Sequence, residues 1–226
     1  MIELHNICKW YGSQQVLHSI SARFEPGSVY GIVGKNGAGK TTLFRCIAGL
    51  ENCDGTIAPK AARLKNKLGF LPTDPYIFSR ITGMEYLQLF CNARGVKNVD
   101  FQERNAFDLP LHQYASTYST GMKKKLALTA ILLQPNDFFI LDEPLNGVDI
   151  QSNILITEII HRLKALNKVV LLSSHIFSTL SDSCDSIFLL ENGRFAQQVQ
   201  KTDFRKLEQE MKQFSIGDSL DRLGLK

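Results

Sequence analysis

Long apolar runs are missing from this sequence, and their absence excludes a chain that crosses a membrane by itself. No stretch approaches the length of about 18 uncharged, apolar residues that a membrane-spanning helix needs. The first residues, 1–5, also lack the basic segment followed by an apolar stretch that marks a secretory signal peptide. We therefore expect any association with a membrane to come through a partner.

Cysteine is scarce and irregularly spaced, which excludes two kinds of protein. The five cysteines are an odd number, and no two of them have the CxxC spacing of a zinc or redox site. A disulfide framework and a cysteine metal site are therefore not expected. We interpret the thiols as reduced and the protein as cytoplasmic.

Charge of one sign is also limited. The formal net charge of +4 mildly favours anionic ligands but does not indicate a nucleic-acid partner. The longest basic run is Lys123–Lys125, which we interpret as the solvated face of a helix. Repeats and low-complexity segments are absent from the sequence, and its 226 residues fit one α/β domain with room for an inserted subdomain.

What the sequence does contain is a glycine-rich loop, GKNGAGKTT, over residues 34–42. Its glycines allow backbone N–H groups to close around a β-phosphate, while Lys40 reaches the β- and γ-phosphates and the Thr41 hydroxyl binds Mg²⁺. A buried strand over 29–33 and a helix over 41–48 are expected to flank the loop, which favours an anion site over a glycine turn that binds nothing. The residues expected around the phosphates are Gly34, Asn36, Gly37, Ala38, Gly39, Lys40, Thr41 and Thr42.

Two acidic residues follow a second buried strand, over 138–141. At such a strand end Asp142 is expected near Mg²⁺, and Glu143 is free to act on an attacking water. A third strand, over 168–172, leads to His175, which can contact the γ-phosphate and hold Glu143 and the water. A lone histidine is more often structural, so its role depends on the other motifs.

Ser119 and Gly121 stand at the start of a helix expected over 121–133. They would offer a hydroxyl and backbone N–H groups at a helix N-terminus, which is a second anion site. The alternative is a plain N-cap, which local evidence favours because serine is common there.

In their order along the chain, these motifs resemble the nucleotide-binding subunit of an ABC transporter, over about residues 1–200. The resemblance includes the segments Ser119–Met122, Leu145–Asp149 and Ser174–His175. It implies ATP and Mg²⁺ as cofactors, an adenine-stacking aromatic at Tyr11, with Trp10 as the neighbouring candidate, and a role at the nucleotide for Asp149. It also implies two copies packed head to tail, so that the phosphate loop of one and Ser119 of the other enclose each ATP.

The fold implied is an α/β P-loop NTPase core with a mixed sheet, an N-terminal antiparallel β-subdomain and an inserted α-helical subdomain. Residues 1–71 and 119–200 would form the nucleotide-binding core with the β-subdomain. Residues 72–118 would form the helical insertion, with helices expected over 82–93 and 101–107. A closing hairpin is expected around residues 192–193, followed by a helix over 202–211 with Thr202 as N-cap, in a short tail over 201–226.

The sequence departs from the family pattern at the position where a glutamine usually binds Mg²⁺. Here Gly69–Pro72 is followed by Thr73 and Asp74. Threonine is too short to ligate in the same way, so Asp74 or an additional water would substitute. The departures at Thr120 and Met122 occur in exporter-type subunits, and Lys35 is tolerated in the phosphate loop.

The compact chain favours an ATPase that drives export through a separate integral-membrane subunit, bound peripherally at the inner face of the cell membrane. Its second cassette would be another copy or a paralogous ATPase subunit. The alternatives are a non-transport ABC ATPase and, less favoured, a P-loop kinase. Three aromatics of the insertion, Tyr76, Phe78 and Tyr86, either receive the membrane subunit or pack the insertion's own core.

Overall fold

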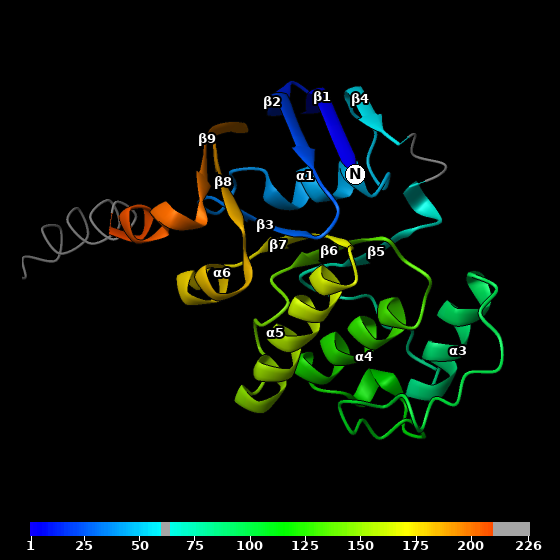
Figure 1. The fold of residues 1–226 in the computed structure, drawn as a ribbon. Coiled ribbons are helices and arrows are strands. Elements are labelled where there is room, and N and C mark those ends of the chain that lie inside the picture. The colour runs from blue at the N-terminus through cyan, green and yellow to red at the C-terminus, as the bar shows by residue number, and fades with distance from the viewer. Residues whose placement is uncertain (60–63, 210–226) are drawn as a thin grey trace, which may run out of the picture.

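The computed structural model describes residues 1–59 and 64–209, and its centre is a mixed sheet of six strands (Figure 1). The strand order is β5-β6-β7-β3-β8-β9, and all neighbours are parallel except β8 and β9, which form the expected antiparallel hairpin. The strands are β3 (Ser28–Val33), β5 (Leu68–Leu71), β6 (Phe138–Asp142), β7 (Val169–Ser173), β8 (Ser186–Glu191) and β9 (Arg194–Gln200).

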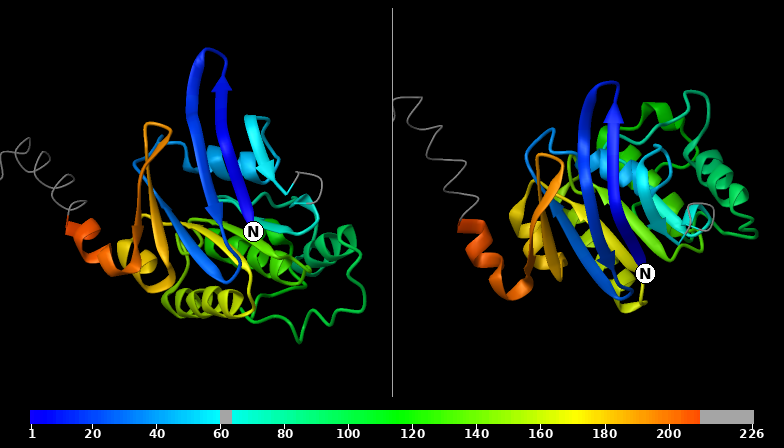
Figure 2. Two further views of the ribbon diagram at one scale, coloured as in Figure 1. Left: turned by 45° about the horizontal axis from the view of Figure 1, so that its top comes forward. Right: turned by 90° about the horizontal axis from the view of Figure 1, so that it is seen from above.

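A second, antiparallel sheet of three strands lies over one face of the central sheet, which confirms the expected β-subdomain (Figures 1 and 2). Its strands are β1 (Ile2–Tyr11), β2 (Gln14–Phe24) and β4 (Asp54–Ala58). Helix α1 (Lys40–Ile47) shares one apolar core with both sheets. The sequence had not indicated β4, whose short DGTIA segment carries a weak strand pattern.

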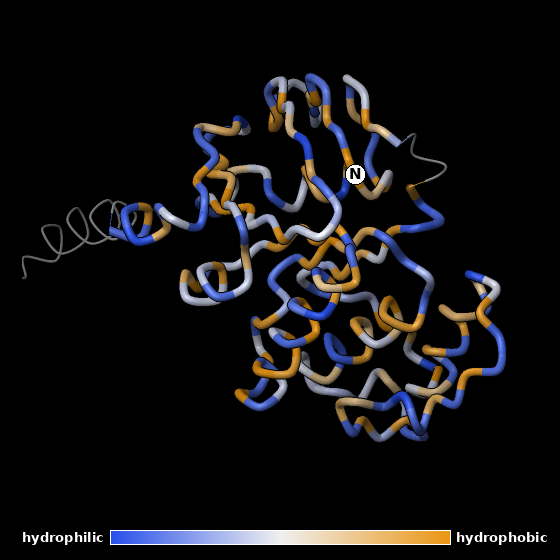
Figure 3. The backbone as a smooth tube through the Cα atoms, viewed as in Figure 1, coloured by the Kyte–Doolittle hydropathy of each residue, from blue (hydrophilic) through white to orange (hydrophobic). Residues whose placement is uncertain are grey.

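Helices cover the opposite face of the central sheet (Figure 1). They are α3 (Gly83–Ala93), the short η1 (Ala115–Thr117), α4 (Thr120–Leu132), α5 (Ile150–Ala165) and α6 (Phe177–Ser183). Strand β7 shows how one segment serves both cores. Val170 and Leu172 face these helices, while Val169 and Leu171 face α1, because successive side chains of a strand point to opposite faces. Figure 3 shows hydrophobic and hydrophilic residues alternating along α5, as its one buried face requires.

Local chemistry explains where the helical predictions hold and where they are wrong. Thr82 and Glu85 form a reciprocal capping box that begins α3 at the expected residue. The helix expected over 101–107 is wrong, because the segment is a series of turns. There Asp100 accepts the backbone N–H of Gln102, and Asn105 accepts that of Leu109. Such local side-chain bonds compete with helix formation.

The last described segment also differs from the prediction. Thr202 lies inside η2 (Lys201–Asp203) and donates its hydroxyl to Asp203, so it does not cap a helix. Helical residues 204–209 follow directly, and the rest of the expected tail lies outside the described residues. Over residues 1–59 and 64–209, no helix has both the length and the apolar character needed to cross a membrane.

Candidate active site

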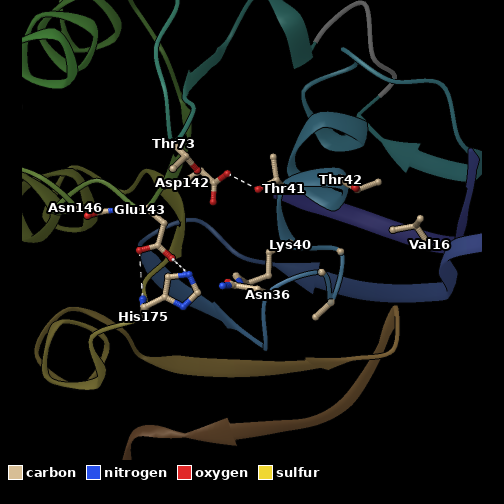
Figure 4. A pocket seen from close by; sticks show the side chains of 13 residues that line it. Val16, Asn36, Lys40, Thr41, Thr42, Thr73, Asp142, Glu143, Asn146 and His175 are labelled. Atoms are coloured by element: carbon tan, nitrogen blue, oxygen red, sulfur yellow. Dashed lines mark hydrogen bonds and ion pairs between the residues drawn. The ribbon is translucent and has the colours of Figure 1, made fainter. Parts of the chain in front are cut away.

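A cavity of about 430 Å³ opens where β3, β6 and β7 end and α1 begins (Figure 4). Carboxyl ends of parallel strands are where open α/β sheets bind ligands. The residues that line the cavity are Val16, Asn36, Gly37, Ala38, Gly39, Lys40, Thr41, Thr42, Thr73, Asp142, Glu143, Asn146 and His175. Sequence motifs separated by more than a hundred residues thus come together at one site.

The loop before α1 needs its glycines for two physical reasons. Gly39, the N-cap of α1, has a φ of 107°, a left-handed conformation that side chains rarely adopt. At Gly34 a Cβ atom would lie 2.2 Å from the carbonyl oxygen of Leu190, so only glycine fits against β8. Gly37 also has a positive φ, and the space where its Cβ would lie is open. The loop is therefore a shaped backbone cradle with an open side.

Lys40 bridges this loop from inside. Its ammonium donates hydrogen bonds to the carbonyl oxygens of Gly34, at 2.7 Å, and Lys35, at 3.4 Å. Burial lowers the pKa of Lys40, while the negative charges of Glu143 and Asp142 oppose this shift. The side chain is therefore a nearly buried cation held at the cradle, where a phosphate would supply the missing counter-charge.

Asp142 is fixed at the end of β6 by two hydroxyl groups. The Thr41 hydroxyl donates to its Oδ2 at 2.8 Å (Figure 4). The Ser173 hydroxyl donates to its Oδ1 at 2.6 Å. Ser173 also accepts the backbone N–H of Glu143 at 3.0 Å. Sequence reasoning missed Ser173, although its position at the end of the neighbouring strand β7 was a signal.

Glu143 and His175 lie side by side in the lining of the cavity (Figure 4). The imidazole Nε2 lies 3.2 Å from Glu143 Oε1, and the backbone N–H of His175 donates to Oε2 at 3.3 Å. Oε1 is buried and, among the described residues, has no hydrogen-bond partner of good geometry. A buried acceptor without a donor is costly, so this oxygen suits a polar group brought by a ligand or a water.

The donor set fits a nucleoside triphosphate with Mg²⁺. The cradle offers backbone N–H groups and a lysine, while Thr41 and Asp142 supply the hard oxygen atoms that Mg²⁺ prefers. Within the described residues no group of three or more His, Cys, Asp and Glu side chains could hold a metal alone. This suits Mg²⁺, which usually keeps waters and phosphate oxygens as ligands. When bound, the ion would neutralise phosphate charge.

Three predicted nucleotide contacts lie outside this cavity. Ser119 is exposed and caps α4, accepting the backbone N–H of Met122 at 3.2 Å. Asp149 caps α5 and accepts hydrogen bonds from the backbone and hydroxyl of Ser152. These bonds, and the nearby Lys125 ammonium, lower the pKa of Asp149. Gly121 packs against Gly147. Within one chain, the structure does not bring these residues to the cavity that would hold the phosphates.

The aromatic candidates also stand apart from the cavity lining. The ammonium of Lys9 lies 4.8 Å from the centroid of the Tyr11 ring and pairs with Glu51 at 3.0 Å. Trp10 is 49% exposed and Tyr11 42% exposed. Val16 of β2 lines the cavity instead, a contact that the sequence had not indicated. Adenine stacking by Tyr11 or Trp10 remains a prediction.

The sequence was compared with protein families and with known proteins. A family model described as "ABC transporter" matches residues 17–146. The bacitracin transport ATP-binding protein BcrA of Enterococcus faecalis is 29% identical, over 96% of this chain and 75% of its own length. The Nod factor export ATP-binding protein I of Sinorhizobium fredii is 32% identical, over 85% of this chain and 61% of its own length.

Solved structures show the same fold. The ATP-binding subunit of an ABC transporter superposes with a TM-score of 0.84 at 27% identity, over 92% of this chain and 93% of that one. The ATP-binding cassette MJ0796, solved as a dimer bound to ADP and Pi, gives a TM-score of 0.79 at 16% identity. It covers 89% of this chain and 99% of its own, and this likeness concerns the fold.

Proposed function

Because this chain belongs to the ABC transporter family, we propose that it binds and hydrolyses ATP as a head-to-tail dimer that drives export through a separate membrane subunit. One observation carries the proposal. The phosphate cradle, Asp142, Glu143 and His175 share one cavity, while Ser119 and Gly121 begin a different helix outside it. This separation supports a nucleotide site that is built from two chains.

A second cassette would complete the site. Ser119 is exposed at the N-terminus of α4, where the positive end of the helix dipole favours an anion. Packed head to tail, the partner's α4 would face the open side of the cradle and meet the γ-phosphate. The partner would be a second copy or a paralogous subunit, and the MJ0796 cassette, which was solved as a dimer, supports such a pair.

The geometry supports a role for each group near the reacting phosphate. Lys40 would turn from its loop carbonyls to the β- and γ-phosphates. Glu143 would orient and polarise the attacking water through Oε1, which lacks a hydrogen-bond partner in the described structure. His175, whose side chain is 51% exposed, would hold that carboxylate and contact the γ-phosphate. Tyr11 or Trp10 would stack on adenine.

The proposal that the protein drives export from a peripheral position at the inner face of the membrane is supported by two exposed aromatic residues and by the names of its relatives. Tyr76 is 75% exposed and forms an edge-to-face pair with the 42% exposed Phe78, at 5.1 Å. Tyr86 is buried and stacks on Phe90, so it belongs to the protein's own core. The exposed pair would receive a cytoplasmic segment of an integral-membrane subunit. The names of BcrA and the Nod factor protein refer to transport and export.

The direct test purifies the tagged chain from its own cells in a gentle detergent. Transport predicts that a protein with about six hydrophobic spans co-purifies and that ATP turnover responds to it. The control is the double variant Tyr76→Asp/Phe78→Asp, which should lose the membrane protein but keep ATPase activity. Recovery of an active ATPase with no membrane protein, from cells that express the neighbouring genes, would favour a non-transport ABC ATPase.

A further inference from the structure

The run Lys123–Lys125 does not form the solvated face that its sequence predicted. Lys124 is only 1% exposed and is among the largest fully buried side chains. Lysine is almost never buried to this degree unless it is paired. The burial of Lys124 therefore needs a specific explanation, and the proposed roles of the residues around the phosphates do not supply one.

Lys124 is held by two backbone carbonyl oxygens of the turn between β6 and α5. Its ammonium donates to the carbonyl of Glu143 at 2.8 Å and to that of Asn146 at 2.9 Å. Among the described residues no carboxylate lies within ion-pair distance of it, although the charges of Asp74, Glu143 and Asp142 act on it. Burial lowers its pKa, and these charges favour the protonated form.

The backbone that Lys124 holds is an unusual one. Glu143 has a φ of 53°, in the left-handed region that residues other than glycine rarely adopt and that the surroundings must enforce. Its N–H is held by the Ser173 hydroxyl, and its carbonyl by Lys124. The carbonyl also accepts the backbone N–H of Asn146 at 3.2 Å. Side chains from β7 and α4 thus help to hold the backbone from which the Glu143 carboxylate projects toward His175.

We propose that Lys124 is a positioning residue that keeps the backbone of Glu143 left-handed and so keeps its carboxylate aimed at the attacking water. Helix α4 starts beside Ser119, which would act on the nucleotide bound by the partner. Through Lys124 this helix is connected to the Glu143 carboxylate, which would act on the nucleotide bound by its own chain. This second part rests on the proposed head-to-tail dimer.

Two neighbouring contacts of α4 support a rigid connection to this turn. A Cβ atom at Gly121 would lie 2.5 Å from the carbonyl oxygen of Gly147, so the backbones of helix and turn touch. Lys125 donates to the Asp149 carboxylate at 3.0 Å and to the Ser152 hydroxyl at 3.2 Å. The start of α4, over residues 121–125, therefore contacts the 143–149 segment at several points, and we expect a displacement of α4 to move that segment.

The test compares Lys124→Met, which keeps the apolar stem and removes the donors, with Lys124→Arg, which keeps charge and donors. Lys123→Met is the matched control, because the Lys123 ammonium makes no hydrogen bond to the 143–149 segment in the described structure. We expect Lys124→Met to lower kcat for ATP about tenfold or more, with KM and nucleotide affinity changed less than about twofold. Lys124→Arg should restore part of the turnover, and Lys123→Met should match the parent.

A second measurement separates positioning from folding. In a Glu143→Gln background, Lys124→Met should not lower the residual turnover further, because its effect passes through that carboxylate. If Lys124→Met does not fold, Lys124→Gln, which keeps two donors, is judged by the same change in kcat and the same cycle. Unchanged kcat in the folded variant, or a full additional loss beside Glu143→Gln, overturns the inference. A parent protein without ATPase activity would instead overturn the proposed function.

Discussion

Glu143 is the residue on which we expect the chemistry to depend most. Its Oε1 is buried beside His175 without a good donor, and its carboxylate lines the same cavity as the cradle. Glu143→Gln should keep ATP binding but lower turnover by about 10²-fold or more. The variant should also trap an ATP-bound dimer, visible by size-exclusion chromatography, that the parent shows only transiently. Turnover equal to that of the parent would remove Glu143 from this role.

Thr73 is the second residue with a testable role, because it lines the cavity where the family pattern has a glutamine. With the shorter side chain, we expect Thr41 and the phosphates to make the direct contacts to Mg²⁺, with waters completing its shell and Asp142 acting through one of them. Thr73→Gln should therefore lower the Mg²⁺ concentration for half-maximal ATPase activity.

The matched variant for this prediction is Asp74→Ala. Asp74 does not line the cavity, and its charge acts on Lys124. We expect the Mg²⁺ requirement to change little in this variant. A sharp rise there, with no change in Thr73→Gln, would show that Asp74 already replaces the glutamine and that Thr73 is not a deficit.

At the scale of elements, the close contact of α4 with the following loop makes Gly121 critical. Adding one methyl group there forces the Cβ atom against the carbonyl of Gly147, which is backbone and cannot rotate away. Gly121→Ala should reduce the free energy of unfolding by about 1–3 kcal/mol, the usual cost of overpacking. Chemical denaturation measures it, with the exposed Thr120→Ala as control. Equal midpoints for the two variants would contradict the contact.

Elements with strong local signals could be predicted from the sequence. The strand before the phosphate loop, the capping box at Thr82 and the hairpin around Asn192 each depend on neighbouring residues alone. The burial of Lys124 could not be predicted, because its partners are carbonyls 19 and 22 residues further along the chain. The turns over 101–107 were not predicted, because they depend on Asp100 and Asn105, whose side chains bond locally to the backbone.

At the scale of the whole molecule, the sequence predicted the phosphate cradle and the acidic residues of the candidate site. It did not predict every residue that lines the cavity. The ordered motifs placed Lys40, Asp142 and His175 correctly in one cavity. Val16 was missed because it comes from the small sheet, whose position over α1 depends on tertiary packing. We propose that the site also extends beyond one chain, because Ser119 lies outside the cavity that it would serve.

The surface pair Tyr76 and Phe78 gives a prediction at this scale. Because both rings are exposed, replacing them with aspartate should leave the melting temperature within a few degrees of the parent. Transport by cells that express the membrane subunit should fall, while ATP turnover of the purified chain should persist. Tyr86→Asp is the contrast, since that buried ring packs the core and its replacement should prevent folding. If the double variant transports normally, Tyr76 and Phe78 take no part in docking the membrane subunit.

The central claim is that each nucleotide is held between two cassettes, and mixing two inactive variants tests it most directly. Ser119→Arg should abolish hydrolysis while the monomer keeps its affinity for ATP, and Lys40→Ala should disable the cradle. A mixed dimer then contains one site with an intact Lys40 and an intact Ser119. Differently tagged chains, co-purified to confirm mixed dimers, should regain ATPase activity that neither parent has. Mixed dimers as inactive as the parents would contradict the account.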